Sequence, residues 1–256
     1  MLKKRLIFVL LYRHGQFHIS RNFRLQKVGT AGWLARNYNF SKVSRFIDEL
    51  VILNVESDGA GRDKFLEVAA EVTSNVFVPV ALGGAIRSLA DAEVYFQNGA
   101  DKVVINSLLW QDPNVVRRIA GVYGEQAVVA SIDYRGLDGG RPPHFRGPGA
   151  PDGSTLASWV KQVAAVGVGE MLLNSVDRDG TGMGLDLGVM DAIPDDIHLP
   201  VVLMGGVGRT DHFRPGLDIP RVSGVATSNL FAFMGEGLSA SRASLLKAGV
   251  PMASWA

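Results

Sequence analysis

The sequence predicts an α/β protein, a (β/α)8 or TIM barrel built from two duplicated half-barrels. Eight short apolar runs recur along the chain, and each is followed by a loop and an amphipathic stretch. The second half of the chain repeats the first at an offset of about 122 residues. A length of 256 residues with 47% hydrophobic composition suits one such barrel. We therefore expect a single domain over residues 1–256, with half-barrel repeats at about 1–122 and 123–256.

The apolar runs have the character of parallel strands that are covered on both faces. Segments such as Val103-Val104-Ile105 and Met171-Leu172-Leu173 are continuously apolar and show no alternation. Strands are expected at residues 5–11, 49–54, 77–82, 102–106, 127–133, 170–174, 201–204 and 223–227. The amphipathic segments between them predict helices at residues 65–74, 88–98, 113–122 and 154–166.

The N-terminus imitates a signal peptide, because Lys3, Lys4 and Arg5 precede an apolar run that reaches Tyr12. That run is at the short limit for such a peptide, and it ends without a small-x-small cleavage site. We interpret it as the buried first strand of a cytoplasmic protein. The formal net charge of +1 gives no reason to expect nucleic acid or a membrane surface as a partner. Zero cysteines exclude a disulfide framework and a thiolate site.

The repeat exposes one mismatch between the halves. Alignment of residues 4–15 with residues 125–137 sets Leu11 against Asp133. One half therefore ends its first strand in a carboxylate, and the other ends it in an isobutyl group. Leucine cannot transfer a proton, so a reaction that needs an acid and a base facing each other has lost one of the pair.

Glycines and small polar residues follow the expected strands once in each half. Backbone amides without Cβ crowding form a good cradle for phosphate at the mouth of a barrel. The members of the two sets are Gly83, Gly84, Asn106 and Ser107 in the first half, and Asp179, Gly180, Thr181, Gly205, Gly206 and Ser228 in the second. Any single glycine is explained by a tight turn, but two symmetric sets favour a phosphorylated small molecule with a phosphate at each end. Asp179 with Asp177 has a second interpretation, in which both only brace Arg178.

Neither a metal ion nor a cofactor is expected. The five histidines show no ligand spacing shared across strands. His14 and His18 lie in the loop after the first strand, where a solvated histidine is the simpler interpretation than contact with a ligand. The Gly- and Pro-rich segment 136–153 follows the strand of Asp133 and is either a lid over the mouth or tolerated loop variation.

Nearly the whole chain resembles the cyclase subunit of the imidazole glycerol phosphate synthase superfamily. The motifs that carry this resemblance are residues 48–53, 83–88, 99–107, 169–181 and 205–208. The resemblance implies a barrel that receives ammonia from a glutaminase subunit, so we expect a heterodimer. It also implies that an aspartate in place of Leu11 works with Asp133 in true cyclases. Ile19, Asn54 and Ala85 are further departures from that family's pattern.

Those departures predict that ring closure is severely weakened or absent. Asp133 then has three interpretations: it is a base in a modified reaction, it orients ammonia or a ligand, or it persists through hydrogen bonds to nearby loops.

Charged residues stand at the start of four expected strands: Arg5, Glu49, Lys102 and Glu170. By resemblance they form a ring of salt bridges at the barrel bottom through which ammonia enters, with Asp101 on the docking face beside it. The alternative is a charge network that only stabilises the barrel. Above the ring, Ile7, Val9, Val80, Ile105 and Val129 are expected to form an apolar inner wall.

The pattern of losses is similar to that of the cyclase-like paralogue in surface-polysaccharide gene sets. That resemblance implies a glutamine-dependent, lyase-type complex that converts an acetamido group of a nucleotide-activated sugar into an acetamidino group, with a separate sugar amidotransferase as a further partner. Two alternatives remain: an authentic cyclase of histidine biosynthesis, and a non-catalytic phosphosugar-binding barrel supported by the glycine cradles alone.

Overall fold

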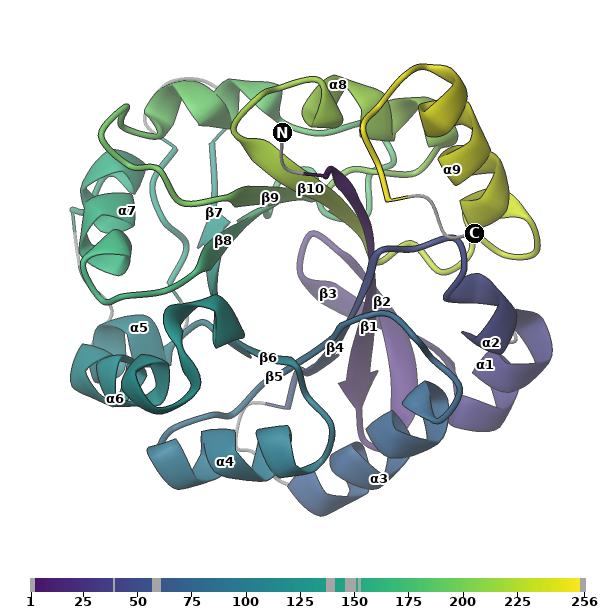
Figure 1. Cartoon of the computed structure of the whole chain (residues 1–256), viewed down its shortest axis with the longest axis horizontal. Helices are drawn as coiled ribbons and strands as arrows, with labels where there is room; N and C mark the ends of the chain where they lie inside the picture. The colour runs from purple at the N-terminus through teal and green to yellow at the C-terminus, as the bar shows by residue number, and fades with distance from the viewer. Residues whose placement is uncertain are drawn as a thin grey trace.

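The computed structural model describes residues 3–38, 40–56, 61–136, 141–145, 151 and 153–253. It confirms the predicted barrel: eight parallel strands close on themselves, and helices surround them (Figure 1). The barrel strands, in their order around the ring, are β1 (Arg5–Arg13), β4 (Glu49–Asn54), β5 (Val80–Gly83), β6 (Lys102–Ile105), β7 (Val128–Tyr134), β8 (Glu170–Ser175), β9 (Val201–Met204) and β10 (Val222–Thr227). Parallel pairing of β10 with β1 closes the ring.

Helices follow the strands as the amphipathic segments predict. The helices are α1 (Ala31–Tyr38), α2 (Phe40–Val43), α3 (Arg62–Thr73), α4 (Leu89–Gln97), α5 (Leu108–Gln111), α6 (Pro113–Tyr123), α7 (Leu156–Ala164), α8 (Phe213–Leu217) and α9 (Gly237–Lys247), with 3-10 turns η1 (Glu125–Ala127), η2 (Leu187–Ala192) and η3 (Thr210–His212). Side-chain caps fix several starts: Ser88 accepts from the Asp91 amide, and Thr155 accepts from the Ser158 amide. Within the described residues, no helix combines the length and apolar character needed to span a membrane.

A hairpin that the sequence reading missed rises from the first strand. It consists of β2 (Gln16–Arg21) and β3 (Arg24–Gly29), and β2 pairs antiparallel with the end of β1. Its two-residue turn, Asn22-Phe23, has positive φ at both positions (50° and 61°), as a type I′ turn requires. The third expected strand, residues 77–82, also needs correction: β5 begins at Val80, and Phe77 is 88% exposed.

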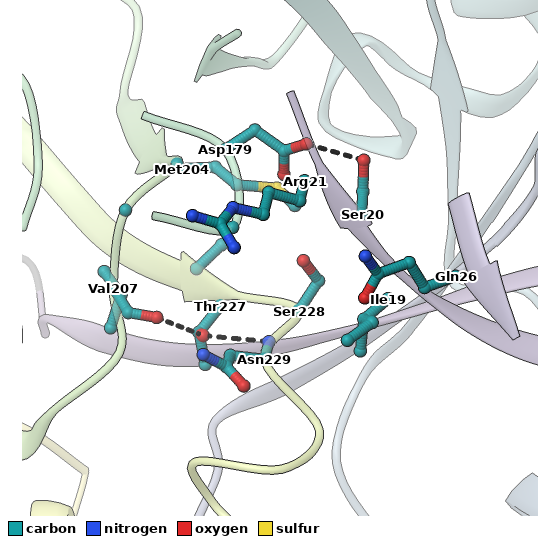
Figure 2. A pocket seen from close by; sticks show the side chains of 14 residues that line it. Ile19, Ser20, Arg21, Gln26, Asp179, Met204, Val207, Thr227, Ser228 and Asn229 are labelled. Atoms are coloured by element: carbon teal, nitrogen blue, oxygen red, sulfur yellow. Dashed lines mark hydrogen bonds between the residues drawn. The ribbon is translucent and has the colours of Figure 1, made fainter. Parts of the chain in front are cut away.

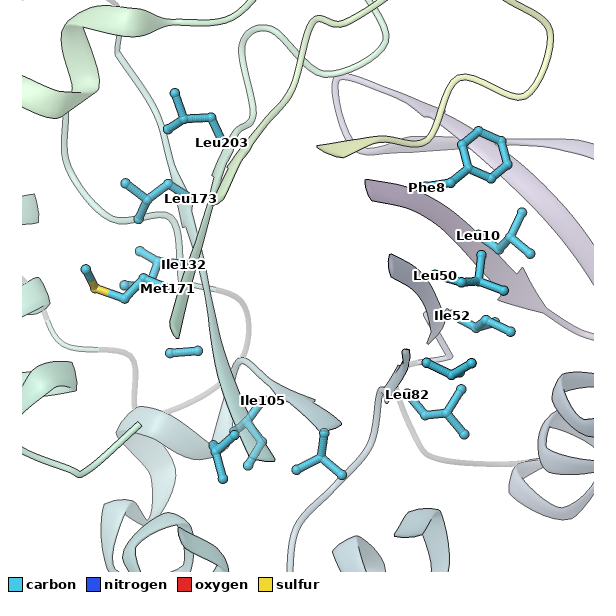
Figure 3. Packing of buried hydrophobic residues seen from close by; sticks show 14 of the residues in the cluster. Phe8, Leu10, Leu50, Ile52, Leu82, Ile105, Ile132, Met171, Leu173 and Leu203 are labelled. Atoms are coloured by element: carbon cyan, nitrogen blue, oxygen red, sulfur yellow. The ribbon is translucent and has the colours of Figure 1, made fainter. Parts of the chain in front are cut away.

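Apolar side chains form two separate clusters on the two sides of the barrel wall. Figure 3 shows the outer one, with Phe8, Leu50, Ile132 and Leu203 pointing away from the barrel interior. The inner cluster fills the barrel and consists of Ile7, Val9, Leu11, Val51, Ala81, Val104, Val129, Leu172, Val202, Met204 and Ala226.

The expected inner wall is therefore only partly right. Ile7, Val9 and Val129 do belong to the inner cluster, but Val80 and Ile105 belong to the outer one. Alternation along a strand is the reason: Lys102 and Val104 face inward on β6, so Ile105 faces the helices. Ala81 pairs with Lys102 and faces inward with it, which turns Val80 outward.

Candidate functional site

A pocket of about 180 Å³ opens at the C-terminal ends of β9 and β10, beneath the β2–β3 hairpin (Figure 2). Its lining includes five of the expected cradle residues: Asp179, Gly180, Gly205, Gly206 and Ser228. Thr181 is not among the lining residues. Its hydroxyl donates to the Arg178 carbonyl (2.8 Å) and accepts from the Met183 amide (3.3 Å), so it stabilises the turn after β8.

The glycines of this cradle are required by close approach of neighbouring backbone. A Cβ on Gly205 would lie 2.7 Å from the Ser175 carbonyl oxygen, and one on Gly206 would lie 2.1 Å from the Gly184 carbonyl oxygen. Both residues have positive φ (102° and 94°). The glycines thus hold the loops together and at the same time line the pocket.

Asp179 fastens the hairpin over the pocket. Its Oδ2 accepts from the Ser20 hydroxyl (2.5 Å) and from the Phe23 amide (2.9 Å), and its carbonyl accepts from the Asn22 amide (3.0 Å). Asp177 accepts from the Gly136 amide (2.7 Å) and so holds the start of the loop after β7. Asp179 therefore acts on the hairpin, which neither of the sequence-based interpretations included.

The hairpin also brings a cation to the pocket. Arg21 lines it, and Figure 2 shows its side chain extending over the space toward the Thr227–Asn229 segment. With the described part of the chain, its guanidinium makes no hydrogen bond or ion pair. Arg21 was not identified from the sequence, because its place at the pocket depends on the unpredicted hairpin. Backbone amides together with a guanidinium are suited to an anionic group.

The first-half cradle is arranged differently. A Cβ on Gly84 would lie 1.9 Å from the Asn54 carbonyl oxygen, and one on Gly83 would lie 2.7 Å from the Val104 carbonyl oxygen. Asn106 donates its amide to Asp133 Oδ2 (3.0 Å). Ser107 immediately precedes α5 and makes no side-chain capping bond there. Asn106, which the repeat aligns with Ser228, is thus bonded to Asp133 at the centre of the mouth.

Asp133, the next-to-last residue of β7, lies between two side-chain amides. Besides Asn106, Asn174 from β8 donates to Asp133 Oδ1 (2.9 Å). Leu11, at the equivalent position on β1, is 7% exposed and belongs to the inner apolar cluster, against which Leu25 and Leu53 also pack. The mouth therefore has an apolar side at β1 and β4 and a polar side at β6 to β8.

The four charged residues at the strand starts form one connected network at the opposite end of the barrel. Glu49 Oε2 accepts from Arg5 Nη1 (2.5 Å) and from Lys102 Nζ (2.8 Å). Glu170 pairs with Arg5 and lies 3.5 Å from Lys102 Nζ. Ser223, which the sequence reading missed, donates to Glu170 Oε1 (2.9 Å). We call Arg5, Glu49, Lys102 and Glu170 the bottom ring.

Electrostatics within the bottom ring favour the charged forms of Glu170 and Arg5. Burial by itself raises the pKa of the Glu170 carboxyl, but Arg5, Lys102 and the Ser223 hydroxyl outweigh burial and lower it. Burial likewise opposes the charge on Arg5, but the two glutamates raise its pKa overall. Asp101 is exposed beside the ring, and its Oδ2 accepts from the Val80 amide (2.8 Å), which fixes the start of β5.

The side chain of His14 is 69% exposed, and its Nδ1 lies 3.3 Å from Glu56 Oε2. The described residues contain no cluster of His, Cys, Asp or Glu suited to a metal ion. Of the expected lid, residues 137–140, 146–150 and 152 lie outside the described residues.

A sequence profile of the family described as "Histidine biosynthesis protein" matches residues 25–234. The chain belongs to the histidine biosynthesis protein family. Within this family it is 44% identical over 243 residues to a protein of Parasynechococcus marenigrum (strain WH8102) that is provisionally named imidazole glycerol phosphate synthase subunit hisF2, covering 94% of this chain and 90% of the relative. It is 32% identical over 253 residues to imidazole glycerol phosphate synthase subunit HisF of Chlorobium limicola (strain DSM 245 / NBRC 103803 / 6330), covering 98% and 99%. This histidine biosynthesis family member is thus a homologue of the HisF cyclase subunit.

Proposed function

We propose that the chain is a cyclase-like, ammonia-conducting subunit of a glutamine-dependent amidation complex, paired with a glutaminase subunit. One observation carries the proposal: the bottom ring is complete, whereas Leu11 stands at the mouth where the acid–base pair needs a carboxylate. The ring also stabilises the barrel, but its retention together with the loss of a carboxylate at the mouth supports a role in conducting ammonia. The ring therefore serves as the ammonia entrance.

The barrel interior above the ring suits neutral ammonia. Its inner cluster is apolar from Ile7 up to Met204, and a charged ammonium ion would be disfavoured there. Ammonia released in bulk water near neutral pH is mostly protonated and no longer nucleophilic. An enclosed path from a glutaminase to the mouth keeps it reactive.

The bottom end of the barrel also offers a surface for a partner. Phe77, just before β5, is 88% exposed, and Val122, in the last turn of α6, is 61% exposed. Both lie at the same end of the barrel as Asp101 and the bottom ring. Exposed large apolar residues beside a polar centre are typical of protein interfaces. We assign this end to the glutaminase subunit.

At the mouth, the pocket beneath the hairpin takes the phosphate of a small molecule. The finer assignment is formation of an acetamidino group on a nucleotide-activated sugar for a surface polysaccharide, with a separate sugar amidotransferase, in the cytoplasm. It rests on the loss of the aspartate at Leu11 together with retention of the bottom ring. The second candidate, an authentic histidine-pathway cyclase, is favoured by the end-to-end match to HisF.

Activity of the glutaminase subunit that pairs with this chain should rise on the order of tenfold or more when the chain is added. Lys102→Ala should abolish that rise, because it removes a cation from the entrance while leaving the barrel core intact. Lys64→Ala, which removes an exposed lysine on α3 that pairs with Glu67, is the matched control and should activate normally. Activation that is unaffected by Lys102→Ala, or no binding at all, would contradict the proposal.

Arg21→Gln should weaken binding of inorganic phosphate to the mouth about tenfold, because one charge-assisted contact is lost. Isothermal titration at constant ionic strength measures this. Arg24 lies opposite Arg21 in the hairpin but does not line the pocket, so Arg24→Gln should change phosphate binding little. Equal losses in the two variants would show that general positive charge, and not the site, attracts phosphate.

A further inference from the structure

β6 pairs with β7 only as far as Ala130, so the last residues of β7 have a free edge on that side. The segment 141–145 pairs with β7 beyond this point. Tyr134 and Pro143 form an antiparallel bridge, the His144 amide donates to the Asp133 carbonyl (2.7 Å), and the Arg135 amide donates to the Pro142 carbonyl (3.0 Å). In this register, His144 lies directly opposite Asp133. Opposite residues of an antiparallel pair point to the same face, with Cβ atoms about 4.5–5.5 Å apart.

That shared face is the mouth of the barrel. The next residue, Phe145, packs in the other direction between Trp110 and Trp159, with ring centroids 5.0 and 5.1 Å away. His144 instead contacts Phe23 at the tip of the hairpin, with ring centroids 5.9 Å apart and planes at 83°. Phe23 is fastened over the mouth by Asp179, so the His144 ring packs against the hairpin tip, on the same face of the β7 edge as Asp133.

An imidazole beside a carboxylate has the chemistry of an acid–base pair. Histidine gains and loses a proton near neutral pH, and a neighbouring carboxylate orients the ring and stabilises the imidazolium form. Asp133 is itself held by Asn106 and Asn174. Among the described residues, the other charged groups on the elements around His144 are Arg21 and Arg24 on the hairpin, Asp177, Arg178 and Asp179 after β8, and Arg135 and Arg141 beside it in the chain.

We propose that His144 and Asp133 form the acid–base pair of this mouth, with His144 exchanging the proton of a bound ligand. The pair supplies the proton transfer that Leu11 cannot perform, with an imidazole in place of a second carboxylate. Its use in amidation rests on the proposed function: when the lone pair of ammonia forms a C–N bond to the carbonyl carbon of an amide, the C=O π pair moves to the oxygen, and the added nitrogen becomes positive and must lose a proton. The neutral His144 imidazole takes that proton and becomes imidazolium, and the Asp133 carboxylate balances its charge.

The test is a histidine-selective NMR titration of the whole chain without a partner. Loss of one set of ring resonances in His144→Gln assigns His144 among the five histidines. The pKa of His144 should then fall in Asp133→Asn, because the imidazolium loses the adjacent negative charge. His198, exposed in the loop before β9, is the internal reference and should titrate unchanged.

An unchanged His144 titration in Asp133→Asn would overturn the proposal. If that variant does not fold, a nuclear Overhauser contact between the Phe23 and His144 rings in the unaltered chain still tests the placement, and its absence also overturns it. Neither measurement involves a glutaminase. Failure of the ammonia-conducting function is therefore distinguishable from failure of the acid–base pair.

Discussion

Gly180→Ala is expected to abolish phosphate binding at the mouth while the barrel stays folded. Gly180 has φ +67°, and a Cβ there would lie 2.2 Å from the Ser20 carbonyl oxygen and 2.7 Å from the Arg21 Cα. Both atoms belong to the backbone of β2, so the whole hairpin must move. Such a movement carries Arg21 away from the pocket and breaks the bonds of Asp179 to Ser20 and Phe23.

Gly182→Ala separates this clash from simple backbone strain. Gly182 has almost the same φ, +66°, but a Cβ there meets only the Gly208 Cα, at 4.0 Å. Each alanine costs about 1–2 kcal/mol for the left-handed conformation. Phosphate titration should therefore distinguish the variants, and faster amide hydrogen exchange at Asn22 and Phe23 should appear in Gly180→Ala alone. Identical binding by the two variants would mean that the hairpin does not complete the pocket.

The sequence was sufficient for the barrel because its strands are buried on both faces. Runs such as 201–204 are apolar throughout, and the strand there has the expected bounds. The run that includes Phe77 was misread because hydrophobicity alone does not distinguish a strand residue from an exposed residue of the preceding loop. Val80 and Ile105 were expected on the inner side of the barrel, but both face outward. Alternation along the strands, counted from the inward-facing Lys102, predicts the outward orientation of both residues.

The hairpin escaped prediction because tertiary contacts hold it in place. Its edge pairing with β1 and the bonds from Asp179 involve residues far apart in the sequence. Every feature that depends on it was missed with it, including Arg21 at the pocket and Phe23 beside His144. The contacts of Asp133 with Asn106 and Asn174 likewise require neighbouring strands to be in register. The sequence shows which polar residues stand at the ends of strands, but it does not show which of them bond to one another across neighbouring strands.

Glu49→Gln is expected to lower the free energy of unfolding by about 3 kcal/mol. Glu49 is 3% exposed and accepts from both Arg5 and Lys102, so the change leaves two cations with Glu170 as their only remaining carboxylate in the ring. The lower end of the range for buried pairs applies, since both cations are about one-fifth exposed. Glu67→Gln, in an exposed pair with Lys64, should change stability by no more than about 0.5 kcal/mol. Urea unfolding of the variants measures both values.

The pH dependence of the same unfolding experiment tests the electrostatic origin of the ring's stability. The folded-state pKa of Glu170 lies below its ordinary value of 4.5. Its carboxylate therefore stabilises the fold above the unfolded-state pKa, and this contribution is lost as the pH falls through the lowered folded-state value. Glu170→Gln should accordingly lose its stability difference from the unaltered chain on acidification. A stability difference that persists at low pH would assign the ring's effect to packing. The cation of Lys102 is partly exposed, so Lys102→Ala should uncouple a glutaminase at a smaller cost in stability than Glu49→Gln.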